Sequence, residues 1–229
     1  MGQYKVKLTV SDGHQSASSE ATFTTRAPVS LVPATGQTFC YDESAKLAQC
    51  PTPGEPFYGQ DASHESPIRT YTKLGADGEE LPMGEGSSKW MMIRDNATGL
   101  IWERKGATAL NPASQTYTWS VDPEASGSTA AYIKALNDGN YGGFNDWRMP
   151  TPRELLLLTH LQDPSPSIHG AIFTHTMHKP DAFGNIDAYW GATPLSGNPY
   201  KAWMIYFDSG RLQLDQTDTP HLVQAVRWP

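Results

Sequence analysis

The chain has 229 residues and a formal net charge of -7. This length suffices to bury a sizeable core, and the 20 glycines, 18 prolines and seven tryptophans indicate a loop-rich folded protein rather than a disordered one. The acidic balance and the lack of a basic run exclude nucleic acid as the expected partner. No run of eighteen apolar residues occurs in the sequence, so no membrane insertion is expected.

The first residues have the pattern of a β-hairpin. YKVKLTV (4–10) and EATFTT (20–25) alternate polar and apolar side chains, and the turn-rich SDGHQSASS lies between them. YKVKLTVSDG resembles the last strands of a PKD or related immunoglobulin-like domain, a repeat that builds stalks in bacterial surface proteins. We expect residues 1–27 to be a hairpin remnant of such a domain, 28–34 a linker and 35–229 a second domain. The resemblance implies neighbouring repeats as partners.

Only two cysteines are present, Cys40 and Cys50, and they lie close together in a loop-like region. In an extracellular protein they would form one local disulfide, and in a cytosolic protein they would be two free thiols. A zinc site would need further ligands, which this segment lacks. We predict the disulfide, and with it a secreted or cell-surface location. Residues 51–82, rich in Gly, Pro and Asp, are expected to hold little regular structure.

The rest of the chain alternates short elements. Residues 89–105 predict two strands around a turn at Asn96-Ala97-Thr98-Gly99, and 128–138 predict a helix that Gly139 ends. A second helix is expected over 151–161. Strands are expected at 188–193, 201–207, 210–214 and 222–228, with a hairpin turn at 208–210. Two helices among short strands predict an α+β fold.

The stretch GGFNDWRMPTPRELLLL (142–158) joins a strand to the second helix. Thr151 has the features of an N-cap, and Glu154 closes a capping box. A nucleophile elbow would need an activated hydroxyl or thiol on the turn, and capping already accounts for Thr151. We predict a rigid, non-catalytic corner, with Trp147 in the core and Arg148 paired with a carboxylate.

Seven short motifs follow one another along the chain, each present once: GQTFCYD, CPTPGEPFYGQDA, DNATGLIWERK, FNDWRMPTPREL, AYWGATP, AWMIYFDSG and the closing AVRW. Between about Thr35 and Trp228 the chain resembles the bacterial domain family named for the C-terminal domain of the Legionella collagen-like adhesin. That family is similar to the C-type-lectin-like fold, in the branch of formylglycine-generating enzyme. The resemblance implies an extracellular ligand-binding module at an adhesin tip. The alternative is a structural cap or spacer of a surface stalk without a ligand of its own.

The sequence departs from the family at one pair of positions. Many members carry a cysteine in the first helix and another just before the final Val-Arg. Here those places hold Tyr132-Ile133 and Gln224-Ala225. If the two cysteines pair with each other in relatives, we expect apolar packing to close the core in this chain instead.

Enzymatic activity is not expected. Formylglycine-generating enzyme acts through cysteine chemistry, and this chain has no cysteine beyond position 50. It also lacks a Ser-His-Asp arrangement with an elbow, an HExxH motif and a phosphate-binding glycine loop. His160, His169, His175 and His178 lie in a loop-rich span, where turns and core anchors explain the pattern more simply than a zinc site does.

Calcium is the one cofactor for which the sequence offers ligands. We expect that the protein requires no cofactor. NDGNYGGFND (137–146) supplies clustered oxygen donors, and the candidates are Asp138, Asn140, Asn145 and Asp146. The segment lacks EF-hand spacing and the lectin signatures, and Asn and Asp beside Gly are also ordinary turn formers.

The large aromatic residues Trp102, Trp147, Trp190 and Trp203 are assigned to the core. By analogy with lectin-like folds, the loops over the terminal strands form the recognition surface. The candidate ligand-binding residues there are Ser196, Asn198, Tyr200, Asp208, Arg211, Asp215 and Asp218. The expected ligand is a glycan or a protein or peptide on a target surface, and a solvated face is the alternative.

Overall fold

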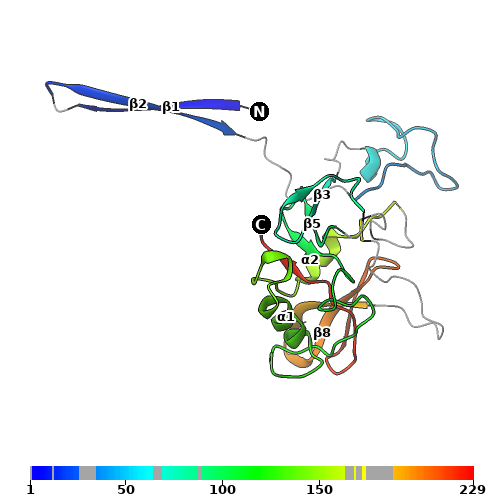
Figure 1. The fold of residues 1–229 in the computed structure, drawn as a ribbon. Helices are drawn as coiled ribbons and strands as arrows, with labels where there is room; N and C mark the ends of the chain where they lie inside the picture. The colour runs from blue at the N-terminus through cyan, green and yellow to red at the C-terminus, as the bar shows by residue number, and fades with distance from the viewer. Residues whose placement is uncertain are drawn as a thin grey trace. The chain divides into compact units, whose positions relative to one another are not determined.

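The computed structural model describes residues 2–11, 13–25, 35–63, 69–86, 89–162, 168, 172–173 and 188–229. The chain divides into two compact units, Met1–Leu31 and Val32–Pro229 (Figure 1). The predicted linker, residues 28–34, lies outside the described residues.

The smaller unit is a two-stranded antiparallel hairpin. β1 (Gly2–Ser11) pairs with β2 (Ser16–Thr25) in a register that runs from Gly2 opposite Thr25 to Ser11 opposite Ser16. The predicted hairpin is confirmed, but β2 begins four residues earlier than expected, because the ladder continues through the serine-rich segment up to a short loop. Leu8 and Val10 keep about two thirds of their surface exposed, at 66% and 65%. Isolated hairpins of this kind are marginal in water.

The larger unit contains a five-stranded antiparallel sheet in the order β10-β6-β5-β3-β4. Its strands are β3 (Tyr71–Leu74), β4 (Glu80–Leu81), β5 (Met92–Asp95), β6 (Ile101–Glu103) and β10 (Val226–Arg227). The turn between β5 and β6 is the predicted one. Asp95 accepts hydrogen bonds from Ala97 N and Thr98 Oγ1, and Gly99 takes the left-handed conformation (φ 80°) that closes it.

A second sheet is an antiparallel meander of β7 (Ala188–Leu195), β8 (Asn198–Tyr206) and β9 (Arg211–Gln216). Among the described residues the helices are α1 (Thr129–Asp138) and α2 (Pro152–Leu157), with short 3-10 turns η1 (Asp61–Ser63) and η2 (Tyr141–Gly143). In Figure 1, β3 and β5 lie at one end of the larger unit, α1 and β8 at the other, and α2 between them. Two helices with short antiparallel sheets make the fold α+β, as the sequence predicts.

Both faces of the β7–β8 pair are covered by apolar side chains. Tyr189, Ile205 and Phe207 join one core cluster together with Trp102. Trp190, Ala202 and Met204 form another cluster, and Trp119 and Met149 pack against it. A further cluster lies around α1 and contains Tyr132, Leu136 and Trp147. Trp102, Trp147 and Trp190 are 0–2% exposed, which confirms their assignment to the core.

Three expectations about these elements were wrong. β3 and β4 fall inside 51–82, where little regular structure was expected, because β3 pairs with β5 from a later segment, and β4 then pairs with the outer edge of β3. α2 ends at Leu157 rather than 161, since Thr159 bridges to Ile168 and Leu161 N donates to Thr35 O. Trp203 is only half-buried, beside the register shift between Trp190 and Pro194 of β7.

Candidate functional site

A pocket of about 480 Å³ lies beside α1. Four segments build it: the loop 119–123, one side of the nearby α1, the corner at 148–149, and β7. Its lining residues are Trp119, Ser120, Val121, Pro123, Thr129, Ala130, Ile133, Lys134, Asn137, Arg148, Met149 and Ala192.

The loop 119–123 is fastened to the start of α1. Ser128 is the N-cap, and its Oγ accepts a hydrogen bond from Ala131 N at 3.1 Å. Thr129 Oγ1 donates to Ser120 O at 2.8 Å and accepts from Ser120 N at 3.1 Å. Trp119 Nε1 donates to Gly191 O at 2.9 Å, which joins the same loop to β7. These bonds hold three of the four segments of the pocket in one geometry.

The corner at 148–149 supplies the fourth segment. Thr151 caps α2 in a capping box with Glu154, as predicted, and a proline occupies the first turn of the helix. Arg148 donates to both carboxylate oxygens of Glu154, at 2.9 and 2.6 Å, and its guanidinium lies over the Trp228 ring at 4.7 Å. Burial opposes ionisation of Glu154, but the bonds from Arg148 and Thr151 outweigh it and hold the pKa of the Glu154 carboxyl below its usual value.

The predicted pairing of Arg148 with a carboxylate is therefore confirmed, with Glu154 as the partner, and Trp147 is buried as expected. Asn137 accepts from Trp147 N at 2.8 Å and donates to Trp147 O at 3.0 Å, so the corner is also bound to α1. The sequence did not show that the outer side of this rigid corner would form one wall of a pocket.

The pocket is mainly apolar, with compensated charge at its rim. Its two basic residues each pair with a carboxylate outside the lining: Lys134 with Asp138 at 2.5 Å, and Arg148 with Glu154. Val121, at the mouth, is 79% exposed. An apolar pocket of this size on a rigid scaffold can take a small ligand or part of a larger one.

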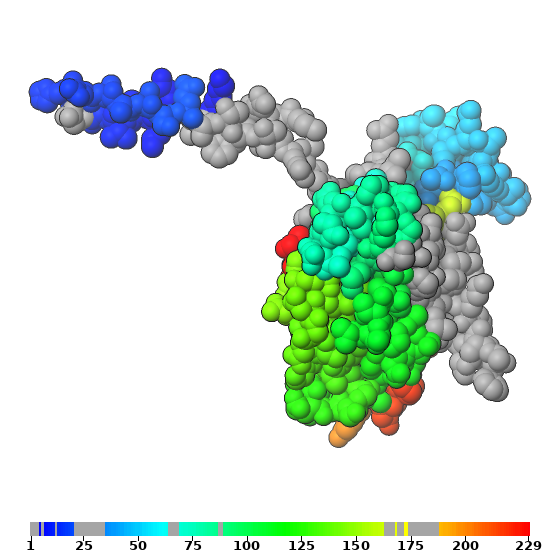
Figure 2. All heavy atoms as spheres, in the orientation of Figure 1, coloured from blue at the N-terminus to red at the C-terminus, as the bar shows by residue number. Residues whose placement is uncertain are grey.

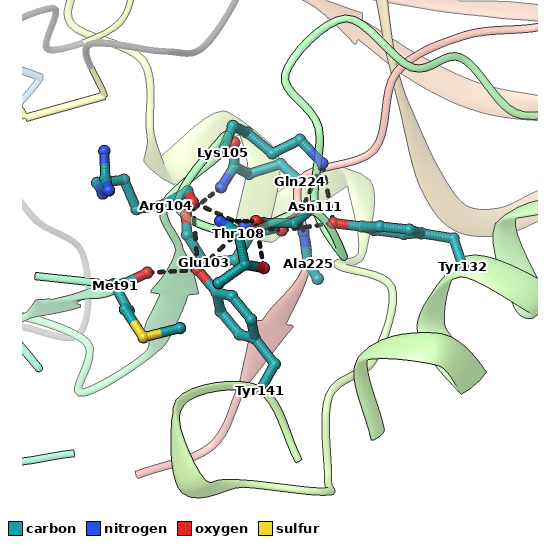
Figure 3. Close-up of polar contacts among 10 residues, drawn as sticks. All are labelled: Met91, Glu103, Arg104, Lys105, Thr108, Asn111, Tyr132, Tyr141, Gln224 and Ala225. Atoms are coloured by element: carbon teal, nitrogen blue, oxygen red, sulfur yellow. Dashed lines mark hydrogen bonds and ion pairs between the residues drawn. The ribbon is translucent and has the colours of Figure 1, made fainter. Parts of the chain in front are cut away.

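Behind α1, a buried polar network joins the helix to β6 and to the end of the chain (Figure 3). Glu103, Lys105 and Asn111 are 0–1% exposed. Tyr132 Oη of α1 donates to Glu103 Oε2 at 2.5 Å, and Lys105 Nζ contacts Glu103 Oε1 at 3.3 Å. Gln224 Nε2 donates to Glu103 O, and Ala225 N donates to Glu103 Oε1, both at 2.6 Å.

Burial changes the acidity of this network. It lowers the pKa of Lys105, against the opposing effect of the Glu103 charge. Burial and the same carboxylate raise the pKa of Tyr132 well above its usual value. The network thus favours the neutral forms of both side chains.

The network connects the two segments at which relatives were expected to carry a cysteine pair. Tyr132 and Ala225 do pack in one apolar cluster. The carboxylate of Glu103 also joins them by hydrogen bonds, which the sequence did not reveal because Tyr132 and Ala225 lie 29 and 122 residues from it.

The seven predicted ligand-binding residues fall at two opposite ends of the meander. Ser196, Asn198 and Tyr200 lie at the β7–β8 turn, and Asp215 and Asp218 join them because Thr217 N donates to Tyr200 O. The turn between β8 and β9, with Asp208 and Arg211, lies at the other end of β8. None of the seven lines the pocket.

Tyr200 is 73% exposed, whereas Asp215 is engaged by His221 at 2.8 Å. Partial burial opposes ionisation of Asp215, but the bond from His221 keeps the pKa of the carboxyl below its usual value. The seven residues therefore do not form one continuous site, and their binding role stays a prediction.

Of the predicted calcium ligands, both carboxylates have cationic partners. Asp138 pairs with Lys134, and Asp146 accepts from Arg227 at 2.6 and 3.1 Å. Asn140 adopts a left-handed backbone conformation ahead of η2, a turn role that suits Asn. Asn145 is exposed in the same loop. Calcium binding here stays a prediction, and a cation would have to compete with Lys134 and Arg227.

Within the described part of the chain, no three His, Cys, Asp or Glu side chains gather where they could hold a metal. His169, His175 and His178 lie outside the described residues.

Cys40 and Cys50 form the predicted disulfide, with their Cα atoms 5.1 Å apart. Their segment stands out as a lobe of the larger unit (Figure 2). The helices of the described residues include none that is long and apolar enough to span a bilayer.

No curated protein matches the sequence. The family described as the Lcl C-terminal domain matches residues 91–227, which is more than half of the chain and includes the pocket, the corner and the buried network. The chain belongs to the Lcl C-terminal domain family.

Proposed function

We propose that this protein is a non-enzymatic ligand-binding module of a bacterial surface adhesin, and that the pocket beside α1 holds an apolar part of its ligand. The ligand is a glycan or a peptide on a target surface. Membership of the Lcl C-terminal domain family indicates a domain of a collagen-like surface protein. The observation that carries the binding role is the pocket itself.

The physical argument rests on how the pocket is built. Its volume of about 480 Å³ falls within the roughly 300–1,000 Å³ usual for ligand sites. Its walls are held by a capped helix, a capping box and a bidentate ion pair. Little ordering entropy is therefore lost when a ligand enters, and a preformed site binds more tightly for the same contacts.

The lining favours a ligand with an apolar face and few charges. Trp119, Ile133 and Met149 offer apolar surface, while Lys134 and Arg148 are already paired. An aromatic or aliphatic peptide side chain fits this chemistry, and so does the apolar face of a sugar ring stacked on Trp119. We do not expect calcium to act in this pocket, because its lining residues include no carboxylate.

The same proposal places the protein outside the cell. A disulfide persists in oxidising environments, and the Cys40–Cys50 bridge is consistent with a secreted or surface-attached chain. The hairpin β1–β2 leaves Leu8 and Val10 exposed, as expected of an element that packs within a neighbouring adhesin repeat.

Binding of the purified chain to arrays of glycans and peptides, with and without calcium, tests the proposal. Ala130 lines the pocket, so Ala130→Trp should fill it and reduce binding at least tenfold. Ala135 is an exposed alanine of the same helix outside the lining, and Ala135→Trp is the matched control that should bind normally. Equal binding by both variants would assign recognition to another surface. Failure of the unmodified chain to bind any array member would favour the stalk-cap alternative.

A further inference from the structure

Lys105, Asn111 and Glu103 combine an amine, a carboxamide and a carboxylate in a fully buried site (Figure 3). Lys105 Nζ lies 3.3 Å from Glu103 Oε1, and Asn111 Nδ2 lies 3.1 Å from Glu103 Oε2. One carboxylate therefore holds the amine on one of its oxygens and the carboxamide on the other. The pocket does not use any of these residues.

We propose that Lys105 and Asn111 form an intramolecular isopeptide bond, with Glu103 transferring the protons. The proposal is independent of the ligand-binding function, because it concerns the buried network behind α1. It would turn a buried salt bridge into a covalent cross-link within the 103–111 segment.

The amine has the environment that a nucleophile needs. The side chains of Lys105 and Glu103 are both 0% exposed, so neither charge is screened by water. Transfer of the ammonium proton to Glu103 gives a neutral amine and a neutral acid, which burial favours. Burial also lowers the pKa of Lys105, in the direction that releases the nucleophilic form. Tyr132 Oη, 2.9 Å from Nζ, keeps the amine in the site.

Hydrogen bonds fix and polarise the carboxamide of Asn111. Asn111 Oδ1 accepts hydrogen bonds from Thr108 N at 3.0 Å and from Thr108 Oγ1 at 3.2 Å. Two donors on this oxygen polarise the carbonyl and stabilise the negative charge that develops on it. Asn111 Nδ2 also faces Arg104 O at 2.7 Å and Tyr141 Oη at 3.0 Å, which fix the plane of the amide.

The reaction balances without an external reagent. The ammonium of Lys105 gives one proton to Glu103, and neutral Nζ forms a bond to Cγ of Asn111, whose carbonyl electron pair moves to Oδ1. Glu103 then protonates Nδ2, the carbonyl re-forms, and the Cγ–Nδ2 bond breaks to release ammonia. One of the two protons on Nζ then returns to Glu103, which ends neutral, and the other stays as the N–H of the new amide. The product is an amide beside a carboxylic acid, and the buried ion pair is gone.

Intact mass spectrometry of the full chain, reduced and denatured, tests this directly. The bond lowers the mass by one ammonia, about 17 Da. Trypsin cannot cleave after an acylated lysine, so the digest should contain residues 105–134 as one peptide with the same deficit. Its fragment ions should place the link between Lys105 and Asn111. The unmodified mass, or the same deficit mapped to another residue, would overturn the proposal.

Variants identify the roles of the three residues. Lys105→Met and Asn111→Ala should restore the full mass expected for each variant, and Glu103→Gln should do so while leaving both reacting groups in place. Lys134→Met changes an exposed lysine of α1 and should keep the deficit. A deficit that persists in Lys105→Met would refute the assignment. Because the unmodified chain is weighed after denaturation, the result does not depend on the stability of any variant.

Discussion

Replacing Glu154 by alanine tests whether the corner at 148–154 is held by its ion pair or by the helix cap alone. The Glu154 carboxylate accepts hydrogen bonds from Arg148 Nη1 and Nη2, from Thr151 N at 2.7 Å and from Thr151 Oγ1 at 3.1 Å. Glu154 is only 9% exposed, so solvent cannot replace these bonds easily.

The cost can be estimated from these contacts. Loss of the capping interaction alone should cost about 1 kcal/mol. The partly buried guanidinium of Arg148 also loses its anion, and hydrogen bonds to charged groups contribute about 1.5–3 kcal/mol. Arg148 keeps 29% of its side chain exposed, so water recovers part of this loss. We expect Glu154→Ala to lower the free energy of unfolding by roughly 2–4 kcal/mol, against about 1 kcal/mol for Thr151→Ala.

Urea unfolding followed by tryptophan fluorescence measures the difference. All seven tryptophans lie between positions 90 and 228, so the signal reports the larger unit. Glu43→Ala, at an exposed loop position, is the control and should change stability little. A loss with Glu154→Ala no larger than that with Thr151→Ala would refute the reasoning, because the ion pair would then contribute nothing.

The same contact predicts a pH dependence. The folded-state pKa of Glu154 lies below its ordinary value of 4.5, so the unfolded chain binds more protons near that pH. The contribution is therefore fully present above about pH 4.5 and is lost as the pH falls through the folded pKa. The stability difference between the unmodified chain and Glu154→Ala should shrink as the pH falls from 6 toward 3, roughly one to two units below the ordinary pKa. A constant difference would contradict the assigned cause.

Three further outcomes are expected. Trp147→Ala should lower the free energy of unfolding by about 3–5 kcal/mol in the same urea assay, because it empties a site that is 2% exposed in the core around α1. Thiol titration of the unfolded, unreduced chain should find no free thiol. Reduction of Cys40–Cys50 should lower the free energy of unfolding by roughly 2–3 kcal/mol, because the unfolded chain gains loop entropy. Two free thiols would remove the support for export. Lys134→Ala should leave the urea midpoint unchanged within error, since its pair with Asp138 is exposed to water. A clear loss of stability would show that the rim of the pocket is more tightly coupled than the contacts indicate.

Local signals in the sequence determined most of the secondary structure of the larger unit. Ser128 and Gly139 mark the ends of α1, and Thr151 marks the start of α2, because caps depend on residues within one helical turn. The turns before Leu100 and Arg211 were equally readable, since left-handed glycines at 99 and 210 close them. Local chemistry also paired Arg148 with Glu154, six residues away.

Features that depend on distant partners were decided by the tertiary structure alone. A charged run such as Glu103-Arg104-Lys105 suggests a solvated surface, yet all three residues are buried. Tyr132 and Ala225, from distant parts of the chain, satisfy the buried Glu103 carboxylate with hydrogen bonds. β3 likewise forms a strand because β5, from a later segment, pairs with it, and the two-residue β4 only extends that edge of the sheet.

In the candidate site, too, local sequence identified individual residues, while the tertiary structure decided which of them lie together. The sequence predicts ligand binding over the terminal strands, and that role stays a prediction; what the sequence did not show is that the antiparallel meander separates Tyr200 and Arg211 to opposite ends of one sheet. The pocket instead draws Trp119, Ile133 and Met149 together from a loop, a helix and a corner. Each of these apolar side chains is locally an ordinary core residue. Only the packing of α1 against the corner leaves space between them, and no pattern within a single segment encodes that space.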